Sequence, residues 1–351
     1  MAPSLLETIQ NTVAVSLVGL PDAVVALLAG RPEVRDGQTL DPQLQLLLRL
    51  MGLAGLPPLE TLSAAQAREV FNASAGLLAP GPRDMLRLLN RKVPGPDGDV
   101  PIRVYVPRTG KSPHPVLVYY HGGGWTVGNL DTHDAVLRVL AHESECVVVA
   151  VDYRMGPEHR YPAAAQDALA AFDWVAQHAT EIGGDPKRLG VGGDSAGGNL
   201  AAVVAQQTLA AGRRGPDFQL LIYPATNLSG ETQSTELLAD GFYLTRSLMR
   251  WFIANYVSST EDRLEPRCSP LLAPDLAGQP PAFVVTAGYD PLRDEGKAYA
   301  ERLLDAGVDV EYRNYGSLIH GFFSMIGVVR EARRAFNDMV AALRVGLGVD
   351  S

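Results

Sequence analysis

The stretch that decides the fold is Val191-Gly192-Gly193-Asp194-Ser195-Ala196-Gly197-Gly198. It follows the apolar run Leu189–Val191 and precedes Asn199–Leu209, whose apolar residues recur with helical spacing. A G-x-S-x-G sequence between a strand and a helix is typical of a nucleophile elbow. Glycines two residues to either side let strand and helix approach closely and tolerate the strained backbone that pushes the serine outward. Because a serine hydroxyl is a poor nucleophile by itself, other parts of the chain must supply a base and an orienting acid.

Short apolar runs alternate with helical patterns on both sides of this elbow. The runs are continuous and rich in β-branched residues, as strands buried on both faces require: Val116–Tyr120, Val147–Val151, Leu189–Val191, Phe218–Tyr223 and Phe283–Thr286. Helical segments such as Ala164–Ala179 lie between them. This alternation predicts an α/β fold with a doubly wound parallel sheet. Ahead of it, the turn cluster Pro94–Gly98 and the alternating Ile102–Val106 predict a β-hairpin.

Two regions depart from the alternation. Residues 1–85 are rich in helical patterns, which are clearest in Gln43–Leu50 and Ala64–Asn72. Asp41-Pro42 and Ser63 have the residue types that begin helices, so we expect these helices to start there. Residues of about 227–263 are polar, aromatic and helical without a strand pattern, which indicates an insertion above the sheet. We therefore expect an α/β domain over 86–351 that carries this insertion, preceded by a helical segment over 1–85.

Composition and charge narrow the range of partners. The chain of 351 residues is 46% hydrophobic and 20% charged, which is typical of a globular protein with one large domain and an accessory segment. A net charge of −9 without a basic cluster argues against nucleic acid or an anionic membrane as a partner. Its two cysteines, Cys146 and Cys268, indicate neither a disulfide framework nor a metal site. We expect a cytoplasmic protein.

The beginning of the chain contains one rather apolar stretch, Asn11–Leu28. It is too short and too interrupted for a transmembrane helix, and it lacks the basic start of a secretory signal. We expect an amphipathic or buried helix here, with contact at a membrane interface as the alternative. No stable membrane insertion is expected.

A glycine loop directly follows one predicted strand: Tyr120-His121-Gly122-Gly123-Gly124-Trp125. Three consecutive glycines cost conformational entropy, so a purely structural loop would rarely need them. They allow backbone N–H groups to point into a cavity, where such donors stabilise developing negative charge. A flexible or phosphate-binding loop is the alternative, but neither glycine pattern of nucleotide-binding loops is complete here. The N–H of Ala196, next to Ser195, would supply a further donor.

His320 is the best candidate for the base among the seven histidines. It lies in Leu318–Phe322, after the strand-like Val308–Tyr312, and it follows Ser195 and an acid in the chain order expected of this fold. The other histidines are less well placed. We expect His114 in a Pro-flanked turn and His159 in an arginine-flanked loop. His142 and His178 should lie on helix surfaces, and His121 should brace the backbone of the glycine loop.

Asp290 is the best candidate for the orienting acid, because it lies in Ala287–Leu292, immediately after the predicted strand Phe283–Thr286. Asp294 and Glu295 are nearby alternatives, but we expect both in the first turn of the next helix, where the helix dipole favours negative charge. Asp194 should leave its strand on the face opposite to its neighbour's side chain. We expect a structural hydrogen bond for Asp194.

These segments together resemble the hormone-sensitive-lipase-like esterases, the bacterial family IV carboxylesterases of the α/β-hydrolase fold. The resemblance rests on the HGGGW segment, the G-D-S-A-G elbow, Asp290-Pro291-Leu292-Arg293-Asp294 and His320-Gly321-Phe322. Asp152–His159 is similar to the family's D-Y-R-L-A-P-E-H, and Ser269–Leu272 also matches. Met155-Gly156 replaces the usual Leu-Ala, a change that concerns packing below the pocket. The similarity extends from about residue 90 to the end of the chain.

The resemblance implies an eight-stranded, mostly parallel sheet flanked by helices, with a helical cap formed by residues 1–85 and about 227–263. It also implies that Ser195, Asp290 and His320 form a catalytic triad, and that the oxyanion N–H groups belong to Gly123, Gly124 and Ala196, with Gly122 in the same loop. Such enzymes need no cofactor or metal and hydrolyse small-molecule esters through an acyl-enzyme, here with short to medium acyl chains. A homodimer is common among them.

Two other functions remain open at the level of sequence. The same triad serves hydrolases of amides, carbamates or lactones, because the fold does not fix the substrate. Non-catalytic ligand-binding proteins also use this scaffold, but they typically lose a member of the triad, whereas this chain keeps all of its candidate residues.

Overall fold

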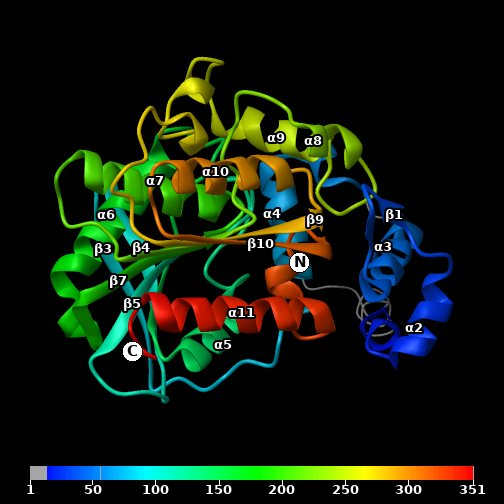
Figure 1. The fold of residues 1–351 in the computed structure, drawn as a ribbon, viewed down its shortest axis with the longest axis horizontal. Helices are drawn as coiled ribbons and strands as arrows, with labels where there is room; N and C mark the ends of the chain where they lie inside the picture. The colour runs from blue at the N-terminus through cyan, green and yellow to red at the C-terminus, as the bar shows by residue number, and fades with distance from the viewer. Residues whose placement is uncertain (1–13, 56, 351) are drawn as a thin grey trace.

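An eight-stranded sheet runs through the molecule in the order β10-β9-β8-β7-β5-β6-β4-β3 (Figure 1). The computed structural model describes residues 14–55 and 57–350. Strands β5 to β10 pair in parallel wherever they are neighbours, while β4 and β3 are antiparallel at one edge. The strands are β3 (Arg87–Gly95), β4 (Gly98–Val106), β5 (His114–Tyr120), β6 (Val147–Val151), β7 (Gly184–Asp194), β8 (Phe218–Ile222), β9 (Ala282–Tyr289) and β10 (Val310–Ile319). The predicted sheet and hairpin are confirmed.

Helices cover both faces of the sheet. On one face lie α5 (Asp134–Ser144) and α11 (Arg330–Gly346), and on the other lie α6 (Ala163–His178), α7 (Ala196–Ala210) and α10 (Arg293–Asp305) (Figure 1). All residues of β5, β6, β8 and β9 are buried between these layers. Alternate strand residues feed two separate hydrophobic clusters, one under each layer of helices. This burial on both faces explains why the strands are continuous apolar runs.

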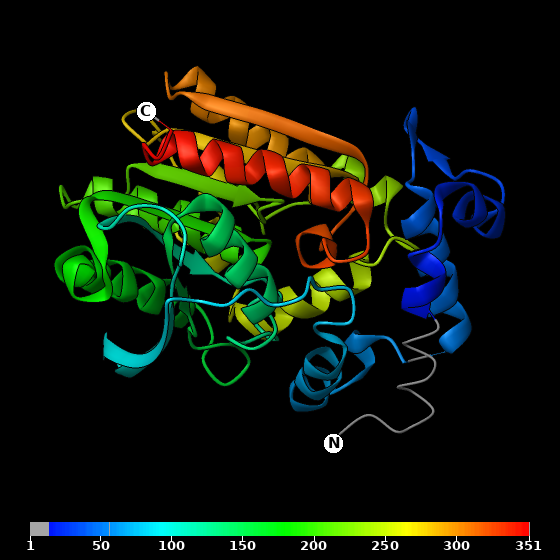
Figure 2. The same ribbon diagram turned by 90° about the horizontal axis from the view of Figure 1, so that it is seen from below.

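The helical N-terminal segment agrees with the sequence pattern in most respects. It contains α2 (Asp22–Ala29), α3 (Pro42–Ala54), the short η1 (Leu59–Thr61) and α4 (Ala64–Ser74). Asp41 caps α3, with Pro42 at its first turn, and Ser63 forms a capping box with Gln66 at the start of α4, as predicted. Figure 2 shows the dark blue α2 and α3 at one end of the molecule, beside the chain that precedes α11, whereas the lighter blue α4 lies apart from them.

The predicted helix over Asn11–Leu28 is only partly described, since residues 11–13 lie outside the described ranges. Its described part forms two helical pieces, 14–18 and α2, which are separated by a break that ends at Pro21. Val18 and Val25 are buried, one in each piece. None of the helices within 14–55 and 57–350 is long and apolar enough to cross a bilayer.

Two local features differ from the expectation. Val34–Arg35 (β1) and Gln38–Thr39 (β2) form a small antiparallel hairpin that the sequence pattern did not indicate. His114 is the first residue of β5 and is buried, so the prediction of a turn at this histidine was wrong. Prolines on both sides suggested a turn, but pairing of His114 with Gly184 of β7 decides its conformation.

The region 227–263 contains no strand, as predicted, and consists of helices and loops that include α8 (Gln233–Leu237), α9 (Arg246–Tyr256) and η3 (Asp262–Leu264). Figure 1 shows α8 and α9 beyond α10, on the side that also holds the N-terminal segment. The two regions touch, because the Ser247 hydroxyl in α9 donates to Glu60 in η1.

Candidate active site

Ser195 lies at a sharp junction between β7 and α7. Its backbone has φ 57° and ψ −119°, a conformation that residues with a side chain rarely adopt. A Cβ atom on Gly197 would overlap the carbonyl oxygen of Tyr120, and one on Gly193 would overlap the carbonyl of Gly197. Both glycines are therefore required for the close approach of strand and helix that exposes the serine.

Parallel strands bring the three candidate residues to one edge of the sheet. Ser195 follows β7, Asp290 follows β9 and His320 follows β10, and the carboxyl ends of parallel strands meet at the same edge. His320 Nε2 lies 3.0 Å from Ser195 Oγ, and His320 Nδ1 lies 2.7 Å from Asp290 Oδ2. The structure thus joins Ser195, His320 and Asp290 in one hydrogen-bonded line.

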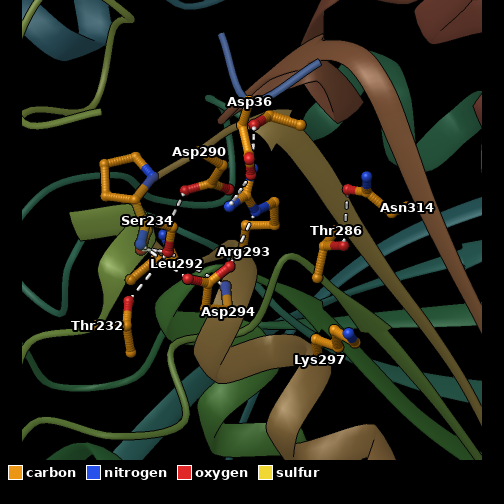
Figure 3. Close-up of polar contacts among 12 residues, drawn as sticks. Asp36, Thr232, Ser234, Thr286, Asp290, Leu292, Arg293, Asp294, Lys297 and Asn314 are labelled. Atoms are coloured by element: carbon orange, nitrogen blue, oxygen red, sulfur yellow. Dashed lines mark hydrogen bonds and ion pairs between the residues drawn. The ribbon is translucent and has the colours of Figure 1, made fainter. Parts of the chain in front are cut away.

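The surroundings fix the acid and the imidazole. The backbone N–H of Leu292 donates to Asp290 Oδ1 at 2.8 Å (Figure 3), and the carboxyl is fully buried. The ring of Tyr223 packs against His320 with 4.6 Å between centroids. Since a carboxylate accepts hydrogen bonds, Nδ1 of His320 carries the proton and Nε2 is left to accept from the Ser195 hydroxyl. This arrangement can draw a proton from the serine.

The glycines of the loop 122–124 differ in what they do. The N–H of Gly122 donates to Asp194 Oδ1 at 2.9 Å, so this amide is engaged within the protein and does not face a substrate. A Cβ on Gly122 would overlap the Asp194 carboxylate. Gly123 and Gly124 have φ values of 123° and 56°, which favour glycine. A side chain on Gly124 would overlap the ring of Phe252 in α9.

Three amides near Ser195 are free to bind an oxyanion. Within the described parts of the chain, the N–H groups of Gly123 and Gly124 have no hydrogen-bond acceptor. Ala196 is the first residue of α7, where an N–H has no acceptor in the preceding turn. These are the donors that the sequence resemblance implied.

A buried network holds the glycine loop from behind. Asp194 Oδ1 accepts from the Tyr119 hydroxyl at 2.8 Å and lies 3.3 Å from His133 Nε2. Burial by itself would raise the pKa of Asp194, but His133 and the hydrogen-bond donors outweigh burial and lower it below its ordinary value. The structural hydrogen bond predicted for Asp194 is confirmed. Tyr119 and His133 were not predicted as partners of Asp194. The one signal in the sequence was Tyr119 itself, whose hydroxyl lies on a strand face that otherwise carries aliphatic core residues.

His121 braces the loop, as predicted. Its Nδ1 lies 2.8 Å from the carbonyl oxygen of Gly122, and the Tyr153 hydroxyl donates to the His121 carbonyl at 2.7 Å. Burial lowers the pKa of His121 to about 4, so its imidazole is neutral and donates through Nδ1. Because a peptide group is planar, fixing the Gly122 carbonyl also fixes the N–H of Gly123 on the opposite side of the same bond.

Asp294 and Glu295 lie in the first turn of α10, as predicted. Glu295 is buried, and its Oε1 accepts from the N–H groups of Thr226 and Asn227 at 2.7 and 3.1 Å. Burial raises the pKa of Glu295 to about 8. Both acids thus serve the loops around the site and neither contacts His320.

Within residues 14–55 and 57–350, no group of three or more His, Cys, Asp or Glu side chains is arranged to hold an ion. Cys146 and Cys268 are buried and unpaired.

Comparisons with known proteins agree with this geometry. A family model described as the alpha/beta hydrolase fold matches residues 117–324. The chain belongs to the α/β-hydrolase family. Carboxylic ester hydrolase LipN of Mycobacterium tuberculosis is 43% identical to this α/β hydrolase over 332 residues, which cover 92% of this chain and 87% of LipN. Carboxylesterase NlhH of the same species is 43% identical over 315 residues, or 88% and 96% of the two chains.

Solved structures give the same result for the fold. An ester hydrolase from the metagenome of Lake Arreo, crystallised with a derivative of bipyridine phosphonate, superposes on this α/β hydrolase with a TM-score of 0.86. The two are 44% identical, and the match covers 88% of this chain and 99% of the other. The resemblance to hormone-sensitive-lipase-like esterases is thereby confirmed.

Proposed function

We propose that this α/β hydrolase is a serine carboxylesterase that cleaves small-molecule esters with short to medium acyl chains. The observation that carries the proposal is the hydrogen-bonded line of Asp290, His320 and Ser195. Beside it lie the backbone N–H groups of Gly123 and Gly124, which have no acceptor among the described residues. Relatives that are 43% identical over most of the chain and are named as carboxylic ester hydrolases support it.

The reaction proceeds through an acyl-enzyme. Ser195 Oγ attacks the ester carbonyl carbon while His320 Nε2 takes the hydroxyl proton, and Asp290 stabilises the imidazolium that forms. Negative charge on the carbonyl oxygen is stabilised by the N–H groups of Gly123, Gly124 and Ala196. When the intermediate collapses, the C–O bond to the alcohol breaks and His320 returns its proton to the departing oxygen. A water molecule then repeats these steps on the acyl-enzyme and releases the acid.

The insertion supports a limited acyl pocket. The ring of Phe252 lies against Gly124, and the ring of Tyr243 lies against Gly321, next to His320. Both aromatic residues belong to the region 227–263, which also contacts the N-terminal segment. These contacts favour a cap made of about 227–263 and residues 1–85 over a catalytic domain of 86–351, with little depth for long chains.

The remaining properties follow from composition and family. The two unpaired, buried cysteines suit a reducing, cytoplasmic location, and the negative charge disfavours nucleic acid as a partner. A homodimer is the assembly that family resemblance suggests. Amide, carbamate or lactone hydrolysis by the same residues is the second candidate function, since the triad geometry serves those bonds as well.

Replacement of the nucleophile tests the proposal. Ser195→Ala should keep the circular dichroism spectrum of the wild type and lose hydrolysis of p-nitrophenyl butyrate by several orders of magnitude. It should also lose labelling by a fluorophosphonate, which reacts only with an activated serine. Ser258→Ala, at an exposed serine of the insertion, is the matched control and should retain both. Ester hydrolysis retained by Ser195→Ala would overturn the assignment. Labelling without ester turnover by the wild type would favour the second candidate.

A further inference from the structure

The loop that carries Asp290 is tied to two segments outside the central sheet. One is the N-terminal hairpin β1–β2, and the other is helix α8 of the insertion. Figure 3 shows the residues that make these connections: Asp36 from the hairpin, Ser234 from α8, and Arg293 and Asp294 directly after the Asp290 loop. None of them touches His320 or Ser195, so their effect on the site must pass through the loop.

Arg293 makes the connection to the hairpin. Its Nη2 lies 3.0 Å from Asp36 Oδ2 at the hairpin tip, and its Nε lies 2.9 Å from Asp294 Oδ1. The residue is only 8% exposed. A buried guanidinium that loses a carboxylate partner leaves an uncompensated charge, which strongly disfavours the arrangement. The two carboxylates therefore hold Arg293 in one position.

The position of Arg293 is transmitted directly to the acid. The backbone N–H of Arg293 donates to the carbonyl of Asp290 at 3.0 Å, and its Nη1 reaches the carbonyl of Gly288 at 3.4 Å. Arg293 thus contacts the backbone both before Asp290, at Gly288, and at Asp290 itself. These contacts fold the segment from Gly288 to Arg293 around the Asp290 carboxyl. A displacement of the guanidinium would move the backbone on both sides of the carboxyl.

Further contacts pack the hairpin onto the same segment. The hydroxyl of Tyr289, the residue before Asp290, accepts from Arg35 N at 3.1 Å and lies 2.6 Å from the carbonyl oxygen of Gln38. A Cβ on Gly288 or Gly316 would be 2.5 or 2.7 Å from Gln38 Oε1, so these glycines make room for that side chain. The hairpin therefore packs against the carboxyl ends of β9 and β10, the two strands that Asp290 and His320 directly follow.

Helix α8 holds the loop from the other side. Asp294 Oδ2 accepts from the backbone N–H of Ser234 at 2.8 Å, and the Ser234 hydroxyl donates to the carbonyl of Pro291 at 2.7 Å. Asp294 is thus shared between α8 and Arg293. Through this shared carboxylate, both segments act on one short loop.

We propose that Arg293 is a positioning residue for the acid Asp290. Held by Asp36 and Asp294, it sets the place of the Asp290 carboxyl and so the hydrogen bond between Asp290 and His320. This inference rests on the proposed function for its kinetic consequence. Misplacement by about 1 Å of a group in a catalytic line costs up to about 100-fold in rate, so a loss of this tether affects turnover more than binding.

The first test separates kcat from KM. Arg293→Gln should lower kcat for p-nitrophenyl butyrate by at least about tenfold and leave KM nearly unchanged. Arg293→Lys keeps the charge without the planar fork and should recover part of the loss. Asp36→Asn should lose a smaller factor, and in combination with Arg293→Gln it should add little, because both act through one ion pair. Lys297→Gln, at an exposed ion pair of the same helix, is the control and should match the wild type.

The second test does not depend on turnover. The proton between His320 Nδ1 and Asp290 should give a far-downfield NMR signal in the wild type. This signal should shift or broaden in Arg293→Gln and stay unchanged in Lys297→Gln. A folded Arg293→Gln variant with wild-type kcat per active site and an unchanged signal would overturn the proposal, even if its melting temperature fell. Should Arg293→Gln fail to fold, Asp36→Asn decides by the same two measurements, since Asp36 is half exposed. If the wild type hydrolyses no ester, the proposed function fails, and the NMR signal still decides the role of Arg293.

Discussion

At the scale of single residues, the glycines around Ser195 have separate causes. Gly122 makes room for the carboxylate of Asp194, whereas Gly124 makes room for the ring of Phe252. Gly197 allows the elbow helix to approach Tyr120. The run of glycines in the sequence indicated that side chains are excluded from this loop. The sequence could not show which group excludes a side chain at each glycine, because those groups come from distant parts of the chain.

Glu295 provides a prediction about stability and pH. Its pKa is raised to about 8 in the folded protein, chiefly by burial, above its ordinary value of 4.5. The folded state therefore keeps a proton that the unfolded state releases, and the stabilisation from this group is complete below about pH 4.5 and is lost as the pH rises toward 8. Glu295→Gln removes this dependence while its amide oxygen can still accept from Thr226 and Asn227. The melting temperature of the variant relative to the wild type should rise between about pH 5 and pH 8.

The control for this measurement is Glu301→Gln, on the exposed side of the same helix. Its melting temperature relative to the wild type should stay constant over the same pH range. A constant difference for Glu295→Gln as well would contradict the prediction and show that Glu295 is ionised in the folded protein throughout.

At the scale of elements, the sequence predicted those strands and helices whose conformation is determined by residues near to one another in the chain. The buried strands β5, β6, β8 and β9 were found from their apolar runs, and α3 and α4 from spacing and caps. The hairpin β1–β2 was missed because its short strands are mostly exposed and carry no apolar alternation. Its conformation depends on Tyr289 and Arg293, which lie far along the chain.

Helix α9 gives a prediction about acyl-chain length. Phe252→Ala removes a ring that lies against Gly124 and so opens space above the proposed oxyanion donors. In a series of p-nitrophenyl esters from acetate to palmitate, the optimum should move to longer chains. The kcat/KM for acetate should fall several-fold, because Gly124 loses the packing that holds it. Arg250→Ala, at an exposed position of the same helix, should leave the profile unchanged. An unaltered optimum in Phe252→Ala would mean that this ring does not bound the acyl site.

At the scale of the whole molecule, chain order was enough to select Ser195, Asp290 and His320, because a parallel sheet brings the ends of its strands together. The residues that surround these three could not be predicted from chain order. Asp194 was recognised as structural, yet its partners Tyr119 and His133 come from other elements and follow no short motif. Sequence reasoning thus predicted the fold and the three residues that the structure joins in one hydrogen-bonded line, whereas the contacts that hold them in place required the structure.

The N-terminal segment raises the question of whether the proposed cap can open as a separate unit. Gln43 of α3 is buried, and its Nε2 donates to the carbonyls of Val18 and Val328 at 2.7 and 2.9 Å. Its Oε1 accepts from the N–H of Arg330 at 2.9 Å. Leu40 and Leu44 belong to the same hydrophobic cluster as residues of α11. These contacts join α3 to the body of the molecule, so we expect the described N-terminal segment to unfold together with the proposed catalytic domain.

Gln43→Ala tests this coupling, because it leaves buried backbone groups on both sides without a partner, at a cost of about 1–3 kcal/mol for each. Circular dichroism and residual esterase activity should be lost in one common transition, several degrees below that of the wild type. Gln45→Ala is the matched control, since the Gln45 Nε2 donates only to Ala29 and Arg31 within the N-terminal segment. It should lower the melting temperature less. A different outcome would be an early loss of helical signal in Gln43→Ala while activity persists. In that case the segment would open independently of the rest of the molecule, and the contacts of α3 with Val328 and Arg330 would be what holds it closed.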